Sequence, residues 1–255
     1  MNRALRILAA LAVLVVASAQ RDPILVPEIS QHSVEVRQGF TGADLLLYGA
    51  ILEPDGTRAA DRRYDIVVVL KGPLEAISLR EKQKRWGIWV NADSAEFRSA
   101  PSYYAVASSS PIEDIVDAKT AAIYELGLDW LQLSPIGAIE TEEQQRFAAG
   151  LVTKRLGSGL YRQDDAGVTI SDGVLYQARI PLPSNVVTGT YTAETFAITD
   201  GRVVASATSE VTVAKRGFER AIEVFSRSQS LLYGLLAVVL SVGMGWIAGR
   251  IFARP

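Results

Sequence analysis

The sequence of 255 residues contains no cysteine and only one histidine, His32. Without cysteine the chain has no disulfides, no thiol nucleophile and no thiolate metal site, so its core alone must hold the fold. A serine–histidine–aspartate triad could use only His32, and a zinc site with several histidines is excluded. A lone histidine beside Ser30 and Ser33 is typical of the surface, where we expect His32 to lie.

A large excess of charge is also missing, since the formal net charge is −2. This value gives no sign of non-specific nucleic-acid binding. No phosphate loop, dinucleotide fingerprint or metal motif is present. The acids Glu140, Glu142 and Glu143 cluster at a predicted helix start, where carboxylates favour the helix dipole. We therefore predict a protein that is not an enzyme and that carries no metal or other cofactor.

Residues 1–19 have the three parts of a secretory signal peptide. Arg3 and Arg6 precede an apolar run over 7–17, and Ala17-Ser18-Ala19 supplies small residues for a signal peptidase. The apolar run is too short to span a bilayer comfortably. An uncleaved signal anchor is the alternative, and both interpretations send the residues that follow across the membrane.

The stretch from Ser230 to Gly249 contains no charged residue. Twenty helical residues rise about 30 Å, which matches the hydrocarbon core of a bilayer. Arg227 and Arg250 flank this stretch, with Tyr233 and Trp246 near its two ends. The pattern predicts a transmembrane helix over 230–250 with a cytoplasmic tail over 251–255, and the alternative is a buried core helix.

The expected orientation places the main domain in the periplasm and the chain in the inner membrane. The signal peptide favours it, and large translocated domains largely ignore flanking charges. The distribution of basic residues alone favours the reverse orientation. Four precede the span and two follow it: Lys215, Arg216, Arg220 and Arg227, then Arg250 and Arg254.

Two features beside and inside the span could contact partners. Small residues recur at a spacing of four and could let another helix approach closely, although chance gives the same pattern: Ala237, Ser241, Gly245 and Gly249. Residues 215–229 carry apolar side chains at helical spacing, namely Phe218, Ala221, Ile222 and Phe225. They predict a juxtamembrane amphipathic helix that lies on the membrane, continues the span outward or packs on the domain.

Residues 20–214 read as one mainly β exported region. β-branched runs and alternating patterns predict strands over 34–37, 45–52, 64–70, 77–80, 86–90, 102–107, 168–170, 174–180, 190–198 and 203–213. Pro54-Asp55-Gly56 and Asp200-Gly201 read as turns. The predicted fold class is an immunoglobulin-like β-sandwich with a two-helix insertion over about 111–156, plus the C-terminal transmembrane helix. One sandwich and two small domains both fit.

Helix signals and one tyrosine support this prediction. Ser110-Pro111-Ile112-Glu113 resembles a capped helix start, for a helix that Gly127 can end, and a second helix opens at Thr141 and can end at Gly157. Gly189-Thr190-Tyr191-Thr192-Ala193 resembles the tyrosine corner of immunoglobulin-like domains, with Ala193 at a core position.

The most concentrated candidate site is a basic segment beside an aromatic one. Arg80, Lys82, Lys84 and Arg85 could bind an anion or a phospholipid headgroup, or they could be a solvated strand edge that deters pairing. The adjoining hairpin candidate, 86–91, is a binding surface if exposed and core if buried. We expect core, and the same for Tyr103 and Tyr104.

Several stretches together resemble an alphaproteobacterial family of conserved single-pass transmembrane proteins of unknown function. They are Gly39-Phe40-Thr41-Gly42-Ala43, Tyr48-Gly49-Ala50, DIVVVLKGP over 65–73, RWGIWVN over 85–91 and PSYYAV over 101–106. The resemblance covers nearly the whole mature chain. It implies an inner-membrane protein with a periplasmic domain and implies no activity. It also implies an association with permeases of the sulfite-exporter type.

Three functions follow as hypotheses. The leading one is a non-enzymatic, membrane-anchored periplasmic accessory or binding protein that partners an inner-membrane permease. The second is a carboxylate-dependent envelope hydrolase, because a pair of acids needs neither cysteine nor histidine. The third is a purely structural tether, for which no ligand is expected.

Overall fold

The computed structural model describes residues 22–37, 39–52, 63–137, 139–215, 222 and 225–252. The chain forms two compact units, one from residues up to 34 and 41–213, the other from 35–40 and 214–255. The predicted signal peptide, the turn at 54–56 and most of the predicted juxtamembrane helix lie outside the described residues. Within that last segment, residues 225–228 are helical.

The first sheet is antiparallel and has the order β1-β3-β11-β10. Its strands are β1 (Ile24–Ile29), β3 (Gly42–Leu52), β11 (Leu175–Pro183) and β10 (Val168–Ser171). Side chains along β11 alternate between exposed and buried, as the period of two requires. β10 pairs only with residues 175–178, so the rest of β11 pairs with β3 alone. Pro181 and Pro183 lie in this edge segment, where a strand tolerates the missing donor.

The second sheet has the order β2-β13-β12-β4-β7-β9. Its strands are β2 (Ser33–Val36), β13 (Arg202–Lys215), β12 (Gly189–Thr199), β4 (Asp65–Lys71), β7 (Tyr104–Ser108) and β9 (Tyr161–Asp164). The apolar run of β4 is buried from Ile66 to Leu70, because strands cover both its edges and residues cover both its faces. The edge strand β9 pairs parallel to β7.

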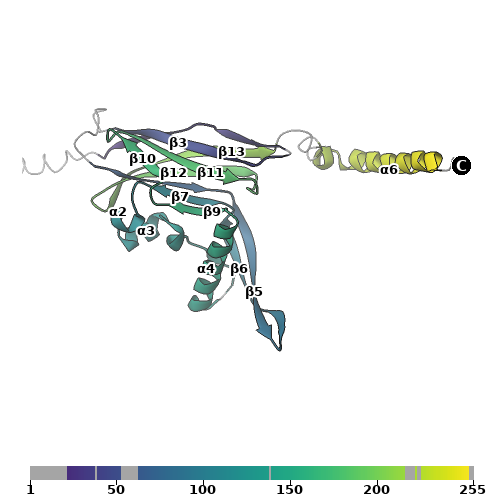
Figure 1. Ribbon diagram of the computed structural model, residues 1–255, viewed down its shortest axis with the longest axis horizontal. Coiled ribbons are helices and arrows are strands. Elements are labelled where there is room, and N and C mark those ends of the chain that lie inside the picture. The colour runs from purple at the N-terminus through teal and green to yellow at the C-terminus, as the bar shows by residue number, and fades with distance from the viewer. Residues whose placement is uncertain are drawn as a thin grey trace, which may run out of the picture. The chain divides into compact units, whose positions relative to one another are not determined.

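The two sheets lie against each other, since β11 contacts β7, β1 contacts β12 and β10 contacts β4 (Figure 1). The order β1-β3-β11-β10 is the order that strands A, B, E and D take in immunoglobulin domains. The run β13-β12-β4 is the order of strands G, F and C. Tyr103 and Tyr104 are both fully buried, as predicted. The Tyr103 hydroxyl donates to the Pro181 carbonyl of β11, whereas the Tyr104 hydroxyl donates to the Glu125 carbonyl, outside the two sheets.

The predicted tyrosine corner has its hydrogen bond. The buried Tyr191 hydroxyl donates to the carbonyl oxygen of Val187 at 2.7 Å, four residues upstream, and Ala193 is 2% exposed. The hairpin turn that follows is also confirmed. Asp200 and Gly201 have φ angles of 51° and 75°, as a two-residue turn with two positive φ angles requires.

We expect Tyr191→Phe to lower the free energy of unfolding by about 1–3 kcal/mol, because the Val187 carbonyl loses its donor. Urea unfolding of the solubilised chain, followed by near-ultraviolet circular dichroism, measures the change. Tyr48→Phe is the matched control, since its side chain is 41% exposed, and should stay within about 0.5 kcal/mol. Equal effects of the two substitutions would rule out a stabilising role for the corner.

A third sheet, β5-β6-β8, is built on a long hairpin that we call the arm. The arm consists of β5 (Leu74–Arg85) and β6 (Ile88–Pro101), and β8 is Ser134–Pro135. In Figure 1 the arm projects from the sandwich with α4 (Thr141–Gly157) beside it. The strands are longer than predicted, and Trp86 and Gly87 form the turn rather than strand.

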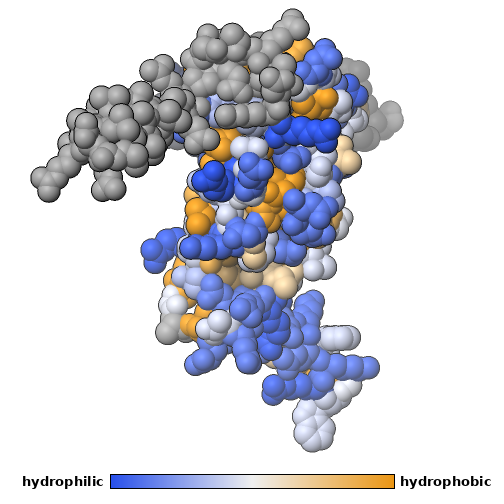
Figure 2. All heavy atoms as spheres, turned by 90° about the vertical axis from the view of Figure 1, so that its left-hand side faces the viewer, coloured by the Kyte–Doolittle hydropathy of each residue, from blue (hydrophilic) through white to orange (hydrophobic). Residues whose placement is uncertain are grey.

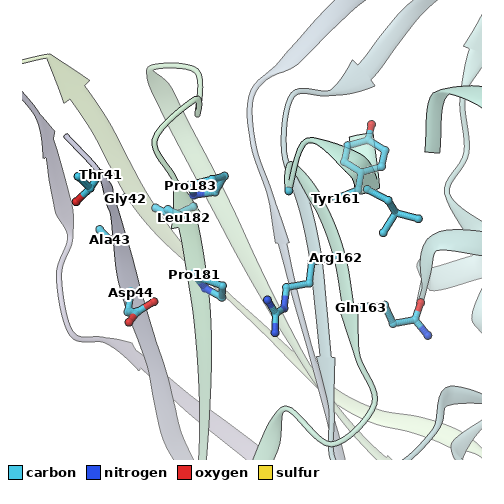
Figure 3. Close-up of a pocket in the computed structure, with 12 residues that line it drawn as sticks. Thr41, Gly42, Ala43, Asp44, Tyr161, Arg162, Gln163, Pro181, Leu182 and Pro183 are labelled. Carbon is cyan, nitrogen blue, oxygen red and sulfur yellow. The ribbon is translucent and has the colours of Figure 1, made fainter. Parts of the chain in front are cut away.

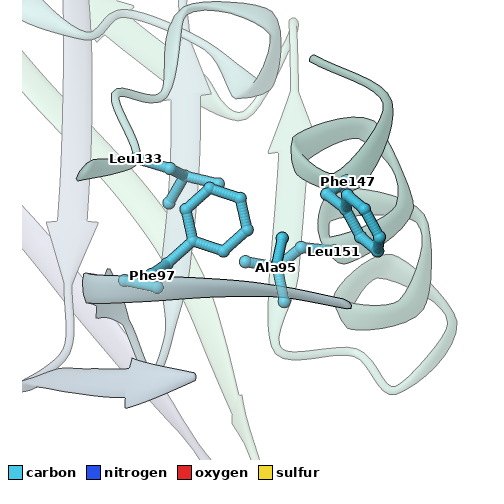
Figure 4. Packing of buried hydrophobic residues seen from close by; sticks show 6 residues of the cluster. Ala95, Phe97, Leu133, Phe147 and Leu151 are labelled. Atoms are coloured by element: carbon cyan, nitrogen blue, oxygen red, sulfur yellow. The ribbon is translucent and has the colours of Figure 1, made fainter. Parts of the chain in front are cut away.

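The arm has a small apolar core of its own, shown in Figure 4. β6 directs Ala95 and Phe97 to one face, where Phe147 and Leu151 of α4 cover them. Ile77 and Leu79 of β5 pack against the same cluster. The α4 bounds confirm the predicted helix from Thr141 to Gly157.

The predicted helix that starts at Ser110 is divided into α2 (Ile112–Ile115) and α3 (Ala118–Tyr124), followed by the 3-10 turn η1 (Leu128–Trp130). Ser110 is not the N-cap, and Pro111, which is, makes no side-chain cap hydrogen bond. The break lies at Val116, whose φ of −140° is extended. Asp117 starts α3 because its carboxylate accepts from the Thr120 amide at 2.9 Å.

The second unit contains α6 (Ser230–Phe252). Its stretch Ser230–Ile251 is long and apolar enough to cross a membrane, and none of it is buried among the residues that the structure describes. A buried core helix is therefore the wrong interpretation. The predicted span over 230–250 agrees with the observed helix.

Candidate functional site

The arm ends in an exposed aromatic turn that we call the tip, residues 82–91. Trp86 and Gly87 have φ angles of 55° and 85°, so they form a two-residue turn. Trp86 is 101% exposed, Ile88 66% and Trp89 68%. The expectation that 86–91 is core is wrong, because the hairpin continues past the part of the arm that α4 covers.

All four predicted basic residues lie on the distal part of β5 with exposed side chains: Arg80, Lys82, Lys84 and Arg85. Cross-strand pairing places Lys84 opposite Trp89 and Arg85 opposite Ile88. The structure thus brings the basic and aromatic segments together as one surface. None of the four forms an ion pair within the described part of the chain.

The acids nearest to the tip are held at its base. Glu81 and Asp93 are cross-strand neighbours, and Arg146 of α4 reaches both carboxylates at 3.3 Å. Like charges directly opposite each other destabilise a sheet, so Arg146 offsets this repulsion. No acidic residue occurs from 82 to 92. The surface beyond Arg146 is therefore cationic and aromatic, and Figure 2 shows strongly hydrophilic atoms on the lower part of the view.

A second candidate is a cleft of about 610 Å³ at the open edge of the sandwich, shown in Figure 3. It lies between the start of β3, the edge segment of β11 and β9. Its charged lining residues are Asp44 and Arg162, and Arg162 is 3.6 Å from the Asp164 carboxylate. Glycoside hydrolysis commonly uses two carboxyl groups, and the lining of this cleft supplies one.

Two tyrosines beside the cleft have structural hydrogen bonds. The Tyr161 hydroxyl donates to the Pro101 carbonyl at 2.8 Å, and the Tyr103 hydroxyl donates to the Pro181 carbonyl at 2.7 Å. Burial raises the pKa of Tyr161 to about 12, and it raises the pKa of Tyr103 still further. Both groups stay protonated at neutral pH and can act as donors, so they fix the strands around the cleft.

Other candidate residues lie apart from the tip. The small residues of the predicted packing ridge, Ala237, Ser241, Gly245 and Gly249, are all exposed on α6. A Cβ added at Gly245 or Gly249 would meet no atom within 4 Å. The His32 side chain is 73% exposed, as expected, and lies 3.2 Å from the Glu28 carboxylate.

Sequence reasoning missed Arg146, which closes the base of the tip from a distant helix. Its spacing to Glu81 and Asp93 in sequence carries no signal, because only the packing of α4 on the arm brings them together. It also assigned Trp86–Asn91 to the core. The unbroken polar run Arg80–Arg85 directly before Trp86 was the available signal that this end of the hairpin lies in solvent.

Comparison with known proteins gives one family. No curated protein and no solved structure matches the chain, so the immunoglobulin-like class stays a prediction that the strand order and the tyrosine corner support. The family model described as "Putative transmembrane protein (Alph_Pro_TM)" matches residues 24–254, which include both the sandwich and α6. The chain belongs to this transmembrane protein family.

Proposed function

We propose that the protein is a non-enzymatic accessory protein that α6 anchors in the inner membrane and whose sandwich and arm act in the periplasm. The observation that carries the proposal is the arm. A hairpin stiffened by its own core presents two tryptophans and four cations to the outside. Tryptophan and arginine dominate binding surfaces, and an exposed ribbon of this kind suits contact with another component of the envelope.

The anchor supports the same proposal. A 23-residue apolar helix that none of the described residues covers is suited to a lipid environment and to other membrane helices. The ridge of small residues offers a face where a second helix could pack closely. An inner-membrane permease, of the sulfite-exporter type that the family resemblance implies, is the partner that we propose for this helix.

The cleft favours binding or a structural role over hydrolysis. Among the described residues that line it, Asp44 is the one carboxylate, and the hydroxyls of Tyr103 and Tyr161 fix its walls. A hydrolase of the two-carboxylate type would need a second acid within reach of the same bond.

The test is affinity purification of the tagged full chain from gently solubilised membranes, followed by mass spectrometry. We expect a stoichiometric membrane protein in the wild-type sample and at least a several-fold loss of it in Gly245→Leu/Gly249→Leu. Leucine fills the ridge while it keeps the span apolar and helical.

Leu235→Ile/Leu236→Ile is the matched control, because both side chains are exposed on α6 outside the ridge. It should retain the partner. If the wild-type chain purifies alone, the accessory function is wrong. If both variants retain the partner equally, the ridge is not the contact.

A further inference from the structure

The tip carries cationic and apolar side chains next to one another, and this arrangement indicates the kind of partner that it binds. We propose that the tip docks on the surface of an anionic lipid bilayer, with Trp86, Ile88 and Trp89 entering the interface and Lys82, Lys84 and Arg85 contacting lipid phosphates. This inference rests on the proposed function, because it names what the arm engages.

Charge is the first argument. The tip holds three cations and no acid, and the nearest carboxylates, Glu81 and Asp93, are already contacted by Arg146. A surface of one sign is complementary to a membrane rich in anionic phospholipid. Each lysine or arginine near such a surface strengthens binding by about fivefold.

The apolar groups supply the second argument. Tryptophan favours the boundary between lipid headgroups and acyl chains, because its ring is apolar and its indole N–H is polar. Trp86 occupies the turn itself, and no residue in the described part of the chain covers it. Long basic side chains beside it can lay their stems on apolar surface while their charges stay among the phosphates.

The distribution around the ribbon favours a bilayer over a protein groove. Cross-strand partners share a face, so Lys84 and Trp89 lie on one face while Arg85 and Ile88 lie on the other. Lys82 lies on the same face as Lys84, because side chains two positions apart on a strand point the same way. Each face thus carries at least one cation and one apolar side chain. A protein groove contacts mainly one face of a ribbon, whereas the interface of a bilayer surrounds both.

The tip also projects far enough beyond the supported part of the arm to enter the interface of a bilayer. Between Arg146's contact at Glu81 and the turn at Trp86, four residues extend beyond the supported part of the arm. At about 3.4 Å per residue they project roughly 14 Å. Amphipathic segments that bind at the interface enter it by about 5–10 Å.

Two assays on the full chain test the proposal. In the first, nanodiscs of phosphatidylcholine carry the protein through α6 and are mixed with dense vesicles of phosphatidylcholine, with or without phosphatidylglycerol, which are then sedimented. In the second, the protein is placed in proteoliposomes with brominated lipids, in a Trp130→Phe/Trp246→Phe background, so that only Trp86 and Trp89 emit. The first detects docking on an opposing bilayer, the second docking on the protein's own bilayer.

We expect phosphatidylglycerol-dependent sedimentation or quenching that falls as salt rises. Lys82→Gln/Lys84→Gln/Arg85→Gln should weaken the signal on the order of a hundredfold, and Trp86→Ser/Trp89→Ser should weaken vesicle binding at least tenfold. Lys119→Gln/Arg179→Gln/Arg202→Gln removes three exposed cations outside the arm and should leave the signal unchanged. The side chains substituted in the tip and control variants are all exposed, so the circular dichroism of these variants should match that of the background in which they are made.

The proposal is overturned if neither assay gives a signal that depends on phosphatidylglycerol, or if the tip and control variants behave alike. A tip that instead retains a purified membrane protein while ignoring vesicles would refute lipid docking and leave the accessory function standing. Vesicle binding without any co-purified protein would support lipid docking and refute the accessory function.

Discussion

Replacing Gly49 with alanine is expected to lower the free energy of unfolding by about 3 kcal/mol or more. Gly49 lies in the middle of β3, between Pro27 of β1 and Tyr176 of β11. An added Cβ would lie 2.5 Å from the Tyr176 hydroxyl oxygen and would also collide with the carbonyl oxygen of Val26. The tyrosine could rotate away, but the Val26 carbonyl belongs to the neighbouring strand and cannot.

The reason for a glycine here is the ring that crosses it. Tyr176 is 2% exposed and is the direct cross-strand partner of Gly49. A glycine in a strand interior leaves backbone uncovered, and an aromatic residue on the next strand can cover it. Burial also raises the pKa of Tyr176, so its hydroxyl stays neutral in this position.

Gly150→Ala is the matched control for this prediction. Gly150 lies inside α4, and a Cβ there would meet no atom within 4 Å. Alanine should stabilise the helix by up to about 1 kcal/mol. Urea unfolding of both solubilised variants makes the comparison, and a Gly49→Ala protein as stable as wild type would show that β1 and β3 can separate without cost.

The parts of the fold that sequence predicted are those with a strong local pattern. The C-terminal helix α6 was predicted from 20 uncharged residues, and α4 from its apolar stripe between Thr141 and Gly157. The hairpin at Asp200-Gly201 and the corner at Tyr191 each depend on a few adjacent residues. Local chemistry decides these features, so the structure agrees with them.

The features that failed depend on tertiary packing. Residues 74–101 form one continuous hairpin. Charged residues interrupt the apolar pattern along its two strands, so the sequence did not reveal how long the strands are. Burial of Trp86 and Trp89 was expected from residue type. Both side chains are exposed because α4 packs on the arm only up to the base of the tip. The helix predicted from Ser110 was divided at Val116 because Asp117 offers its own capping carboxylate.

For the candidate site, the sequence identified the residues but not the surface that they form together, because that surface also depends on tertiary packing. The four cations and the aromatic residues were identified separately, because they are adjacent in sequence. That they form one exposed surface follows from the pairing of Lys84 with Trp89, and that the nearest acids, Glu81 and Asp93, are contacted at its base follows from the position of Arg146. Neither could be read from a single chain without the register of the hairpin.

Phe97→Ala is expected to cost about 3–5 kcal/mol, and most of this loss should fall on the arm. Phe97 is fully buried in the cluster with Phe147 and Leu151, which joins β6 to α4 (Figure 4). This cluster is separate from the core between the two large sheets. A cavity here therefore loosens α4 from the hairpin, while the sandwich keeps its own contacts.

Hydrogen exchange read by mass spectrometry distinguishes local from global loosening. Peptides from 74–101 and 141–157 should lose protection in Phe97→Ala, whereas peptides from β4 and β12 should keep it. Leu74→Ala, at a side chain 68% exposed on the same arm, should change neither set. If protection falls equally in β4 and β12, the arm and sandwich unfold as one cooperative unit. In that case the packing of α4 on the hairpin stabilises the whole domain, and the arm is not an independently folded support for the tip.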